Sequence, residues 1–415
     1  FLGDYIYETT GNPSFQAPTE ARNVSVPDGR ALGDGEDSYY AALTVADYRA
    51  LYRQFRSDPD LQEAHRLYPF VTIWDDHEFS DDSWQDHANY FDGTMGDEQD
   101  TARREASSRA WFEYTPADLS FDAAAGFPSD LSIYRQLRFG KHVELFLTDQ
   151  RSYWDDHLVP EGPANPDVGK IFPESSLGSR YFVLKSGFDA LEAAANPSPT
   201  MLGSNQKQWL LDSMGASNAT WKIWGSETQL GQMTIDLSDL EALPEQYKDL
   251  FYFNCDQWDG YRTERAEILS AVGGAGENVV VLTGDIHAFY ATELHADFDK
   301  PSDPPLAVEF VCAGISSAPV QELTQNTVDG NATLSDLGLG DIVPMFDQRL
   351  TAAGPHYKFA RSNVNGIGIV DVEGDQRVRV TMLTTGDVKK EAFDPNDVKR
   401  DTFLCQAGSN RIDTA

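Results

Sequence analysis

Short β-rich runs alternate with segments of helical periodicity along most of this chain, and that alternation restricts the folds open to it. Helical spacing of apolar and aromatic residues predicts helices over residues 43–67 (with a break at Asp58-Pro59), 102–114, 206–214 and 262–272. β-rich runs predict strands over residues 70–74, 143–147, 220–224 and 278–282. Three further runs, over residues 306–311, 366–372 and 377–382, follow with no helix expected between them. Alternating elements with an antiparallel tail indicate an α/β protein with a sheet or sandwich of mixed direction.

Neither an internal repeat nor a Pro-rich linker divides the 415 residues, so we predict one catalytic domain over residues 1–415. Residues 1–8 have the pattern of the end of a buried strand, and we expect their sheet to begin upstream of this sequence. Residues 9–42 are rich in Gly, Pro, Asn and Asp and predict a long irregular connection.

The charge of the chain excludes several classes of partner. Lys and Arg number 32 and Asp and Glu 67, so the formal charge is 32 − 67 = −35. Such a protein repels nucleic acids and acidic lipids, and it binds an anionic substrate only where a bound metal inverts the local field. No run of about 18 apolar residues is present, so no integral membrane contact is expected. The acidic surface fits a secreted, marine or salt-adapted protein, and we expect a secreted, periplasmic or cell-surface location.

The cysteines exclude two further architectures. Cys255, Cys312 and Cys405 are too few and too widely spaced for a disulfide framework or a thiolate zinc site.

Polar clusters follow three of the β-rich runs. They are Asp4 with Tyr7, the run Asp75-Asp76-His77-Glu78, and Asp285 with His287. Taken singly, each has an ordinary explanation, such as a turn, a helix cap or a buried core residue. Taken together, they place carboxylates, imidazoles and a phenol at strand ends, where open α/β sheets bind ligands. Such a donor set suits Ca²⁺, Mn²⁺ or Fe³⁺.

These clusters resemble the signature motifs of PhoD-type alkaline phosphatases, within the calcineurin-like and purple-acid metallophosphatase group. The matching blocks are Gly3 to Glu8, Trp74 to Glu78 and Thr283 to His287, together with Leu147 to Tyr153, Asp256 to Tyr261 with Arg265, and the helical region from Asp47 to Leu61. The resemblance extends from residue 1 to about residue 385.

The resemblance implies a four-layer α/β/β/α metallophosphatase sandwich of mixed sheets that holds Fe³⁺ and Ca²⁺, with two calcium ions suspected. By analogy, Asp4 would bridge two metals, and Tyr7 and His287 would bind the iron. Asp76 and Asp285 would hold the neighbouring calcium. The family places a further ligand, often Cys, on a strand upstream of the first motif, and we expect that strand to lie outside this sequence. Many relatives also carry an N-terminal β-domain and an export signal, and neither is visible here.

Two residues are candidates for catalysis itself. The resemblance implies that His77 lies beside the phosphate, where it would protonate the leaving group, and that Arg151 contacts phosphate oxygens. Asp149 either orients Arg151 or ends its strand. Tyr153, Trp258 and Tyr261 either line the mouth of a pocket or belong to the core. Other candidates for the surroundings of the metals are Asp75, Asp259 and His356.

We therefore predict metal-dependent hydrolysis of small phosphate monoesters and diesters by a metal-activated hydroxide. One alternative is a phospholipase D-like or nucleotide phosphodiesterase activity on the same scaffold. A second is a calcium-binding surface protein without enzymatic activity, whose motive is the missing upstream ligand and the charge of −35. The sequence makes no prediction of oligomeric state.

Overall fold

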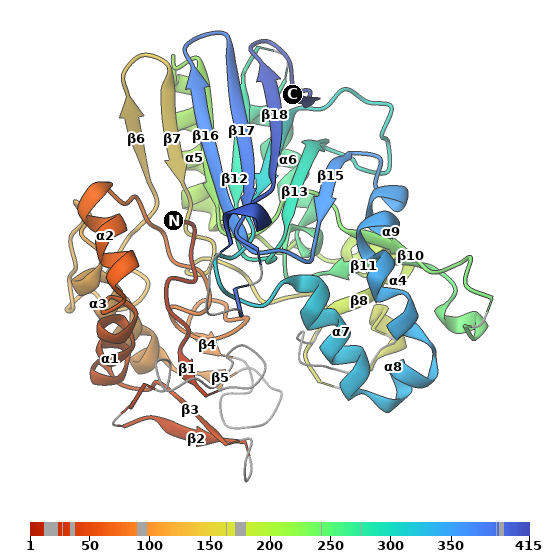
Figure 1. The fold of residues 1–415 in the computed structure, drawn as a ribbon, viewed down its shortest axis with the longest axis horizontal. Helices are drawn as coiled ribbons and strands as arrows, with labels where there is room; N and C mark the ends of the chain where they lie inside the picture. The colour runs from red at the N-terminus through yellow and green to blue at the C-terminus, as the bar shows by residue number, and fades with distance from the viewer. Residues whose placement is uncertain are drawn as a thin grey trace. The chain divides into compact units, whose positions relative to one another are not determined.

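The computed structural model describes residues 1–11, 24–26, 28–33, 38–88, 98–162, 164–170, 180–241, 243–274, 276–386, 388–389 and 394–415. The chain forms two compact units (Figure 1). Unit 1 consists of Phe1–Tyr134 and Thr148–Asp155, and unit 2 of Arg135–Leu147 and Asp156–Ala415. The single catalytic domain expected over residues 1–415 stays a prediction. Among the described residues, no helix has both the length and the apolar character needed to cross a membrane.

The helices of unit 1 match their sequence patterns. They are α1 (Val45–Phe55), α2 (Pro59–Leu67) and α3 (Thr101–Tyr114). Thr44 and Asp47 form a reciprocal capping box at the start of α1. Asp58 caps α2 and Pro59 occupies its first turn, so the expected break between the two helices is confirmed.

The strands of unit 1 are short. Three lie within the expected irregular connection and form an antiparallel sheet: β1 (Thr9–Thr10), β2 (Arg30–Leu32) and β3 (Tyr39–Ala41), in the order β1-β3-β2. The prediction of a purely irregular segment over residues 9–42 was therefore wrong for these parts, and its residues 12–23, 27 and 34–37 lie outside the described residues. A second antiparallel pair consists of β4 (His87–Ala88) and β5 (Glu98–Gln99).

The strands expected over residues 1–8 and 70–74 are not formed as such. Only one parallel bridge joins the two segments, between Leu2 and Ile73. The Phe1 amino group donates to the Val71 carbonyl at 2.8 Å, and Ile73 N–H donates to the Phe1 carbonyl at 3.1 Å. The extended run is too short for a ladder because the polar motifs begin directly after it, at Gly3 and Asp75. The pairing nevertheless sets the two motifs side by side.

Unit 2 is built on a seven-stranded mixed sheet. In spatial order its strands are β15 (Tyr357–Arg361), β13 (Phe289–Leu294), β14 (Ala307–Val311), β12 (Val279–Thr283), β9 (Trp221–Ser226), β7 (Val143–Leu147) and β6 (Arg135–Phe139). The central pairs from β14 to β7 are parallel, and the outer pairs are antiparallel. β12 and β14 are buried on both faces, as expected of central strands in a parallel arrangement.

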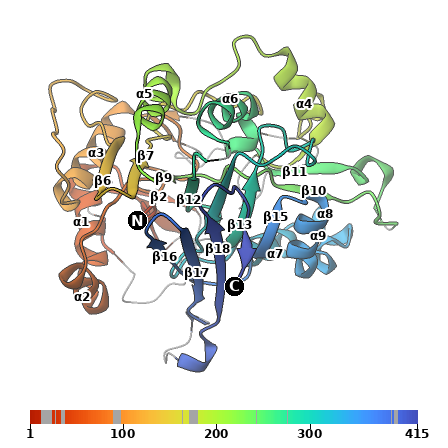
Figure 2. The ribbon, with the colours of Figure 1, turned by 90° about the horizontal axis from the view of Figure 1, so that it is seen from above.

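A four-stranded antiparallel sheet packs against one face of the seven-stranded sheet. It consists of β16 (Gly366–Glu373), β17 (Arg377–Thr384), β18 (Arg400–Gln406) and β19 (Asp413–Thr414). Phe289 and Phe310 on the larger sheet share a core with Val380 and Phe403 on the smaller. α5 (Gly203–Ala216) and α6 (Arg262–Val272) cover the opposite face (Figures 1 and 2). The expected α/β class with mixed, face-packed sheets is confirmed.

The remaining elements of unit 2 form a second core. Its strands β8 (Tyr181–Leu184), β10 (Thr234–Asp236) and β11 (Leu250–Asn254) make a small antiparallel sheet. The helices are α4 (Lys185–Ala194), α7 (Val320–Gly330), α8 (Ala332–Asp336) and α9 (Phe346–Ala353). Short 3₁₀ segments are η3 (Pro166–Val168), η4 (Glu245–Tyr247), η5 (Trp258–Gly260), η6 (Leu339–Asp341), η7 (Val343–Met345) and η8 (Pro395–Asp397).

The expectation that no helix separates β14 from β16 was wrong. α7, α8 and α9 lie between these strands. On α7 the buried positions include Thr324 and Thr327 beside Val320 and Val328. Half of the buried face therefore lacks the apolar side chains on which the periodicity argument depends.

Candidate active site

One glycine and one glutamate hold the first two motifs together in unit 1. Gly3 has φ +104°, and a Cβ atom there would lie 2.3 Å from the Cβ of Asp75, so only glycine allows this approach. The Glu78 carboxylate accepts hydrogen bonds from the backbone N–H groups of Asp4, Tyr5 and Asp75 at 3.0, 2.6 and 2.8 Å. Burial raises the pKa of Glu78 above its usual range. Glu78 stands within the second motif, but the sequence predicted no role for it.

Carboxylates of unit 1 are close enough to share cations. Two groups of three residues have ligand atoms within 4.8 Å of one another, namely Asp4, Asp76 and His77, and Asp76, Asp81 and Asp82. Oδ2 of Asp75 and Oδ1 of Asp76 are buried and have no hydrogen-bond partner among the residues that the structure describes. Buried carboxylate oxygens of this kind are stabilised by a cation, so the donor set fits a hard metal ion. Asp81 and Asp82 come from the acidic turn shortly after the second motif, and the sequence did not predict them as ligands.

Arg151 lies beside these carboxylates. Its Nε donates to Asp75 Oδ1 at 2.5 Å, and its Nη2 is 3.7 Å from Asp76 Oδ1. The guanidinium is buried and lies over the Trp154 ring, 4.5 Å from its centroid. Burial raises the pKa of Asp75, although the positive charge of Arg151 opposes this shift.

His77 is held from two sides. Its Nδ1–H donates to Glu8 Oε2 at 2.7 Å, and its ring stacks on Tyr7 with centroids 3.8 Å apart. Burial opposes a charge on the imidazole, but Glu8, Asp76 and Asp4 raise the pKa of His77 well above its usual range. A protonated imidazole with a fixed orientation is suited to proton donation.

Asp149 and Tyr153 lie on the segment that carries Arg151. Asp149 accepts hydrogen bonds from the Trp74 indole at 2.8 Å and from Ser152 N–H at 3.1 Å. Asp75 is thus a carboxylate that pairs with Arg151, and the two alternatives for Asp149 stay predictions. The Tyr153 ring makes an edge contact with Tyr134 at 5.9 Å between centroids.

In unit 2, Asp285 and His287 follow β12 with left-handed backbone, at φ +64° and +54°. Asp4 in unit 1 shares this conformation, with φ +56°. Non-glycine residues adopt it at a cost, and such strain collects at functional sites. The Nδ1–H of His287 donates to the Ala318 carbonyl at 2.7 Å, which fixes the orientation of the ring. A ring held through Nδ1–H in this way is typical of histidines that bind a metal through Nε2.

A glutamine for which the sequence predicted no role contacts Asp285. Gln257 donates a short hydrogen bond from Nε2 to Asp285 Oδ2 and is buried. Its neighbour Trp258 is 0% exposed and Tyr261 1% exposed, which agrees with the core alternative for both aromatic rings.

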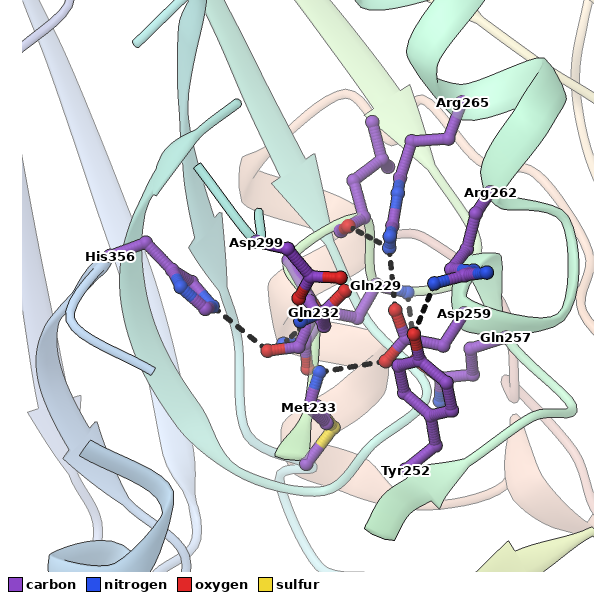
Figure 3. Close-up of polar contacts among 12 residues, drawn as sticks. Gln229, Gln232, Met233, Tyr252, Gln257, Asp259, Arg262, Arg265, Asp299 and His356 are labelled. Atoms are coloured by element: carbon purple, nitrogen blue, oxygen red, sulfur yellow. Dashed lines mark hydrogen bonds and ion pairs between the residues drawn. The ribbon is translucent and has the colours of Figure 1, made fainter. Parts of the chain in front are cut away.

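Asp259 and His356 bind the loop that precedes β10 (Figure 3). Asp259 accepts from Met233 N–H at 2.7 Å and from Arg265 Nη1 at 2.8 Å. His356 donates from Nε2 to the Gln232 carbonyl at 2.8 Å. These contacts give both residues a part in fixing the loop.

Comparisons with known proteins agree on one family. A family model described as PhoD-like phosphatase matches residues 1–382. Alkaline phosphatase D of Bacillus subtilis (strain 168) is 31% identical over 320 residues, which cover 76% of this chain and 45% of that protein. A solved structure described as the structure of PhoD matches with a TM-score of 0.68 and 23% identity, over 100% of this chain and 65% of that one. This chain thus spans about half the length of the curated relative, and the structural match shows the fold.

Proposed function

Because the chain belongs to the PhoD-like phosphatase family, we propose that it hydrolyses phosphate esters, with small monoesters and diesters as substrates. The observation that carries this proposal is the cluster of Asp4, Asp76 and His77, whose side-chain atoms lie within 4.8 Å of one another, so that two carboxylates for a cation stand beside a proton donor. An acidic protein needs such a cation site to accept a doubly charged ester.

The proposed metal ligands come from the family motifs in both units. By the family resemblance, Asp4, Tyr7 and His287 would hold Fe³⁺, and Asp76 and Asp285 would hold Ca²⁺; a second Ca²⁺ is proposed without an assigned ligand set. The donors match these ions, since carboxylate oxygens suit calcium and a phenolate with an imidazole suits iron. The orientation of the His287 ring, fixed through Nδ1, and the buried Oδ1 of Asp76 support the assignment.

The bound metals would neutralise the ester and lower the pKa of water toward neutrality. The other roles belong to the chain itself. His77, held by Glu8, would give its Nε2 proton to the leaving oxygen. Arg151, held by Asp75, would stabilise negative charge on the equatorial phosphate oxygens.

The test is hydrolysis by the purified full-length protein of p-nitrophenyl phosphate, bis(p-nitrophenyl) phosphate and phosphatidylcholine, with elemental analysis and a visible spectrum of the same sample. We expect turnover of the first two, iron plus calcium, and a tyrosinate absorption band from Tyr7. Preference for phosphatidylcholine would favour the phospholipase D-like alternative. Metal binding without hydrolysis would favour a calcium-binding surface protein.

Substitution of the proposed metal ligands tests whether the activity depends on them. Asp4→Asn and Asp285→Asn should each lower kcat/KM by about 10³-fold or more, since each removes a charge that the metals require. Asp375→Asn, an exposed turn residue, is the matched control and should keep full activity. Full activity in a folded Asp4→Asn or Asp285→Asn protein would overturn the proposal.

We also propose that the protein acts outside the cytoplasm, as a secreted, periplasmic or cell-surface enzyme. The net charge of −35 supports this location, because excess carboxylates keep an exported protein apart from other acidic surfaces. Cell fractionation of the native host, with phosphatase activity assayed in each fraction, is the test; activity confined to the cytoplasm would contradict it.

A further inference from the structure

The loop over residues 227–233, which links β9 to β10, is held by side chains from other elements. Glu309, a fully buried residue on β14, accepts from Leu230 N–H and Gly231 N–H at 2.8 Å each and from Thr283 Oγ1 at 2.8 Å. Arg265 Nη1 donates to the Leu230 carbonyl at 2.7 Å. Backbone groups that are buried away from regular structure need such partners, and this loop has them.

The end of the loop nearest β10 is also held by hydrogen bonds from side chains. Met233 N–H donates to Asp259, which is itself paired with Arg265, and the Gln232 carbonyl accepts from His356 (Figure 3). The loop is therefore a rigid support within unit 2, held by α6, β14 and the segment before β15.

A side-chain hydrogen-bond path leads from this loop to a proposed metal ligand. Gln229 N–H donates to Gln257 Oε1 at 3.0 Å, and Gln257 Nε2 donates to Asp285 Oδ2. A backbone N–H can only donate, so the oxygen of the Gln257 amide must face Gln229 and its NH₂ group must face Asp285. The orientation of this amide is thus fixed by the loop.

We propose that Gln257 is a positioning residue that sets the orientation of the Asp285 carboxylate for metal binding. The inference rests on the proposed function, in which Asp285 is a metal ligand. Asp285 needs such a partner, because its left-handed backbone does not by itself determine where the carboxylate points. A neutral amide meets the need better than Lys or Arg, because it orients the carboxylate without cancelling the charge that attracts the cation. The rigid loop prevents Gln257 from turning away when no metal is bound.

The test compares two variants that each remove hydrogen bonding at this loop. Gln257→Met removes the donor to Asp285, whereas Tyr357→Phe removes only the 2.6 Å bond between Gln229 Nε2 and the Tyr357 hydroxyl. The readout is the melting temperature of the full chain in chelator and over a buffered series of Ca²⁺ concentrations. We expect Gln257→Met to raise the Ca²⁺ concentration at half-maximal stabilisation about 10–100-fold. Tyr357→Phe should leave that Ca²⁺ concentration unchanged. In chelator the two variants should have similar melting temperatures.

Each outcome separates this inference from the proposed function. Equal shifts in the two variants, or an unchanged Ca²⁺ dependence in Gln257→Met, would overturn the positioning role. If Gln257→Met does not fold, Gln257→Asn serves instead, since it stays polar but is too short to bridge both partners; it should also weaken Ca²⁺ binding about tenfold. If the native protein itself shows no stabilisation by Ca²⁺, the proposed calcium site fails and the role of Gln257 fails with it. If Asp285→Asn weakens the response and Gln257→Met does not, only the present inference fails.

Discussion

His356 shows how strongly a single buried side chain in unit 2 depends on pH. Burial lowers the pKa of His356 to about 3, while its Nε2–H stays bound to the Gln232 carbonyl and its ring packs against Phe298 at 4.7 Å. The unfolded chain takes up a proton near pH 6.5, so the folded state loses stability as the pH falls from about 6.5 toward 3. The slope from this group is about 1.4 kcal/mol per pH unit.

We therefore expect His356→Gln, whose amide can still donate to Gln232, to reduce the acid sensitivity of the fold. Between pH 7.5 and pH 5, the free energy of unfolding in urea should fall by about 2 kcal/mol less in the variant than in the native protein. An identical pH dependence in the two proteins would show that His356 titrates normally.

The left-handed backbone of Asp285 gives a second prediction for a single residue. At φ +64° a glycine is unstrained, whereas alanine has a cost of about 1 kcal/mol or more. In chelator, Asp285→Gly should therefore be more stable than Asp285→Ala by about 1 kcal/mol. Asp375, a turn residue without positive φ, supplies the control pair and should give the opposite order. The free energy of unfolding decides the matter, and greater stability of Asp285→Ala would contradict the strain argument.

The capping box at the start of helix α1 contains two residues whose contributions to stability should differ. Asp47 is fully buried and accepts from the N–H groups of Asp28, Leu43 and Thr44 at 2.9, 3.1 and 3.0 Å. The Thr44 hydroxyl accepts from Asp47 N–H at 3.4 Å and donates to Asp47 Oδ2 at 3.1 Å. Asp47→Ala leaves several buried donors unpaired and should cost about 3 kcal/mol, against about 1 kcal/mol for Thr44→Ala. Chemical denaturation of both variants tests the order, which fails if Thr44→Ala is the more harmful.

Elements with a dense local pattern were predictable, and those stabilised by distant contacts were not. α6 begins and ends where its periodicity does, and the break between α1 and α2 is marked by Asp58-Pro59. α7 has threonines on its buried face, so its helical period is weak. β1 has two residues and exists through its pairing with β3, which no local pattern encodes.

At the scale of the molecule, the sequence predicted the candidate site better than it predicted the residues that hold it. Asp4, Asp76 and Asp285 stand in contiguous motifs, so each is visible without knowledge of the fold. Glu78 bonds to Asp4 and Tyr5, which are 74 and 73 positions away in the sequence, and Gln257 bonds to Asp285, 28 positions away. Hydrogen bonds over such separations leave no periodic pattern in the sequence. The Gly3 approach to Asp75 is likewise a consequence of folding, although a glycine before an acidic residue at a strand end is a signal for it.

The net charge of −35 gives a prediction for the whole chain. Carboxylates outnumber basic side chains by more than two to one, 67 against 32, so the folded state confines mutually repelling charges that the unfolded chain can spread apart. Salt screens this repulsion, with a Debye length that falls from about 30 Å at 0.01 M to about 10 Å at 0.1 M. The melting temperature in chelator should therefore rise between these concentrations of NaCl and level off above them.

A second salt distinguishes screening from binding of a particular ion. Tetramethylammonium chloride supplies the same ionic strength with a cation too large for a carboxylate cluster, so it should raise the melting temperature nearly as much as NaCl does. A rise with NaCl alone would mean that Na⁺ occupies the acidic cluster of unit 1, and Asp76→Asn should then abolish it. A melting temperature that stays flat or falls in both salts would show that the excess carboxylates do not repel one another enough to matter, because the ion pairs lost to screening outweigh the repulsion relieved.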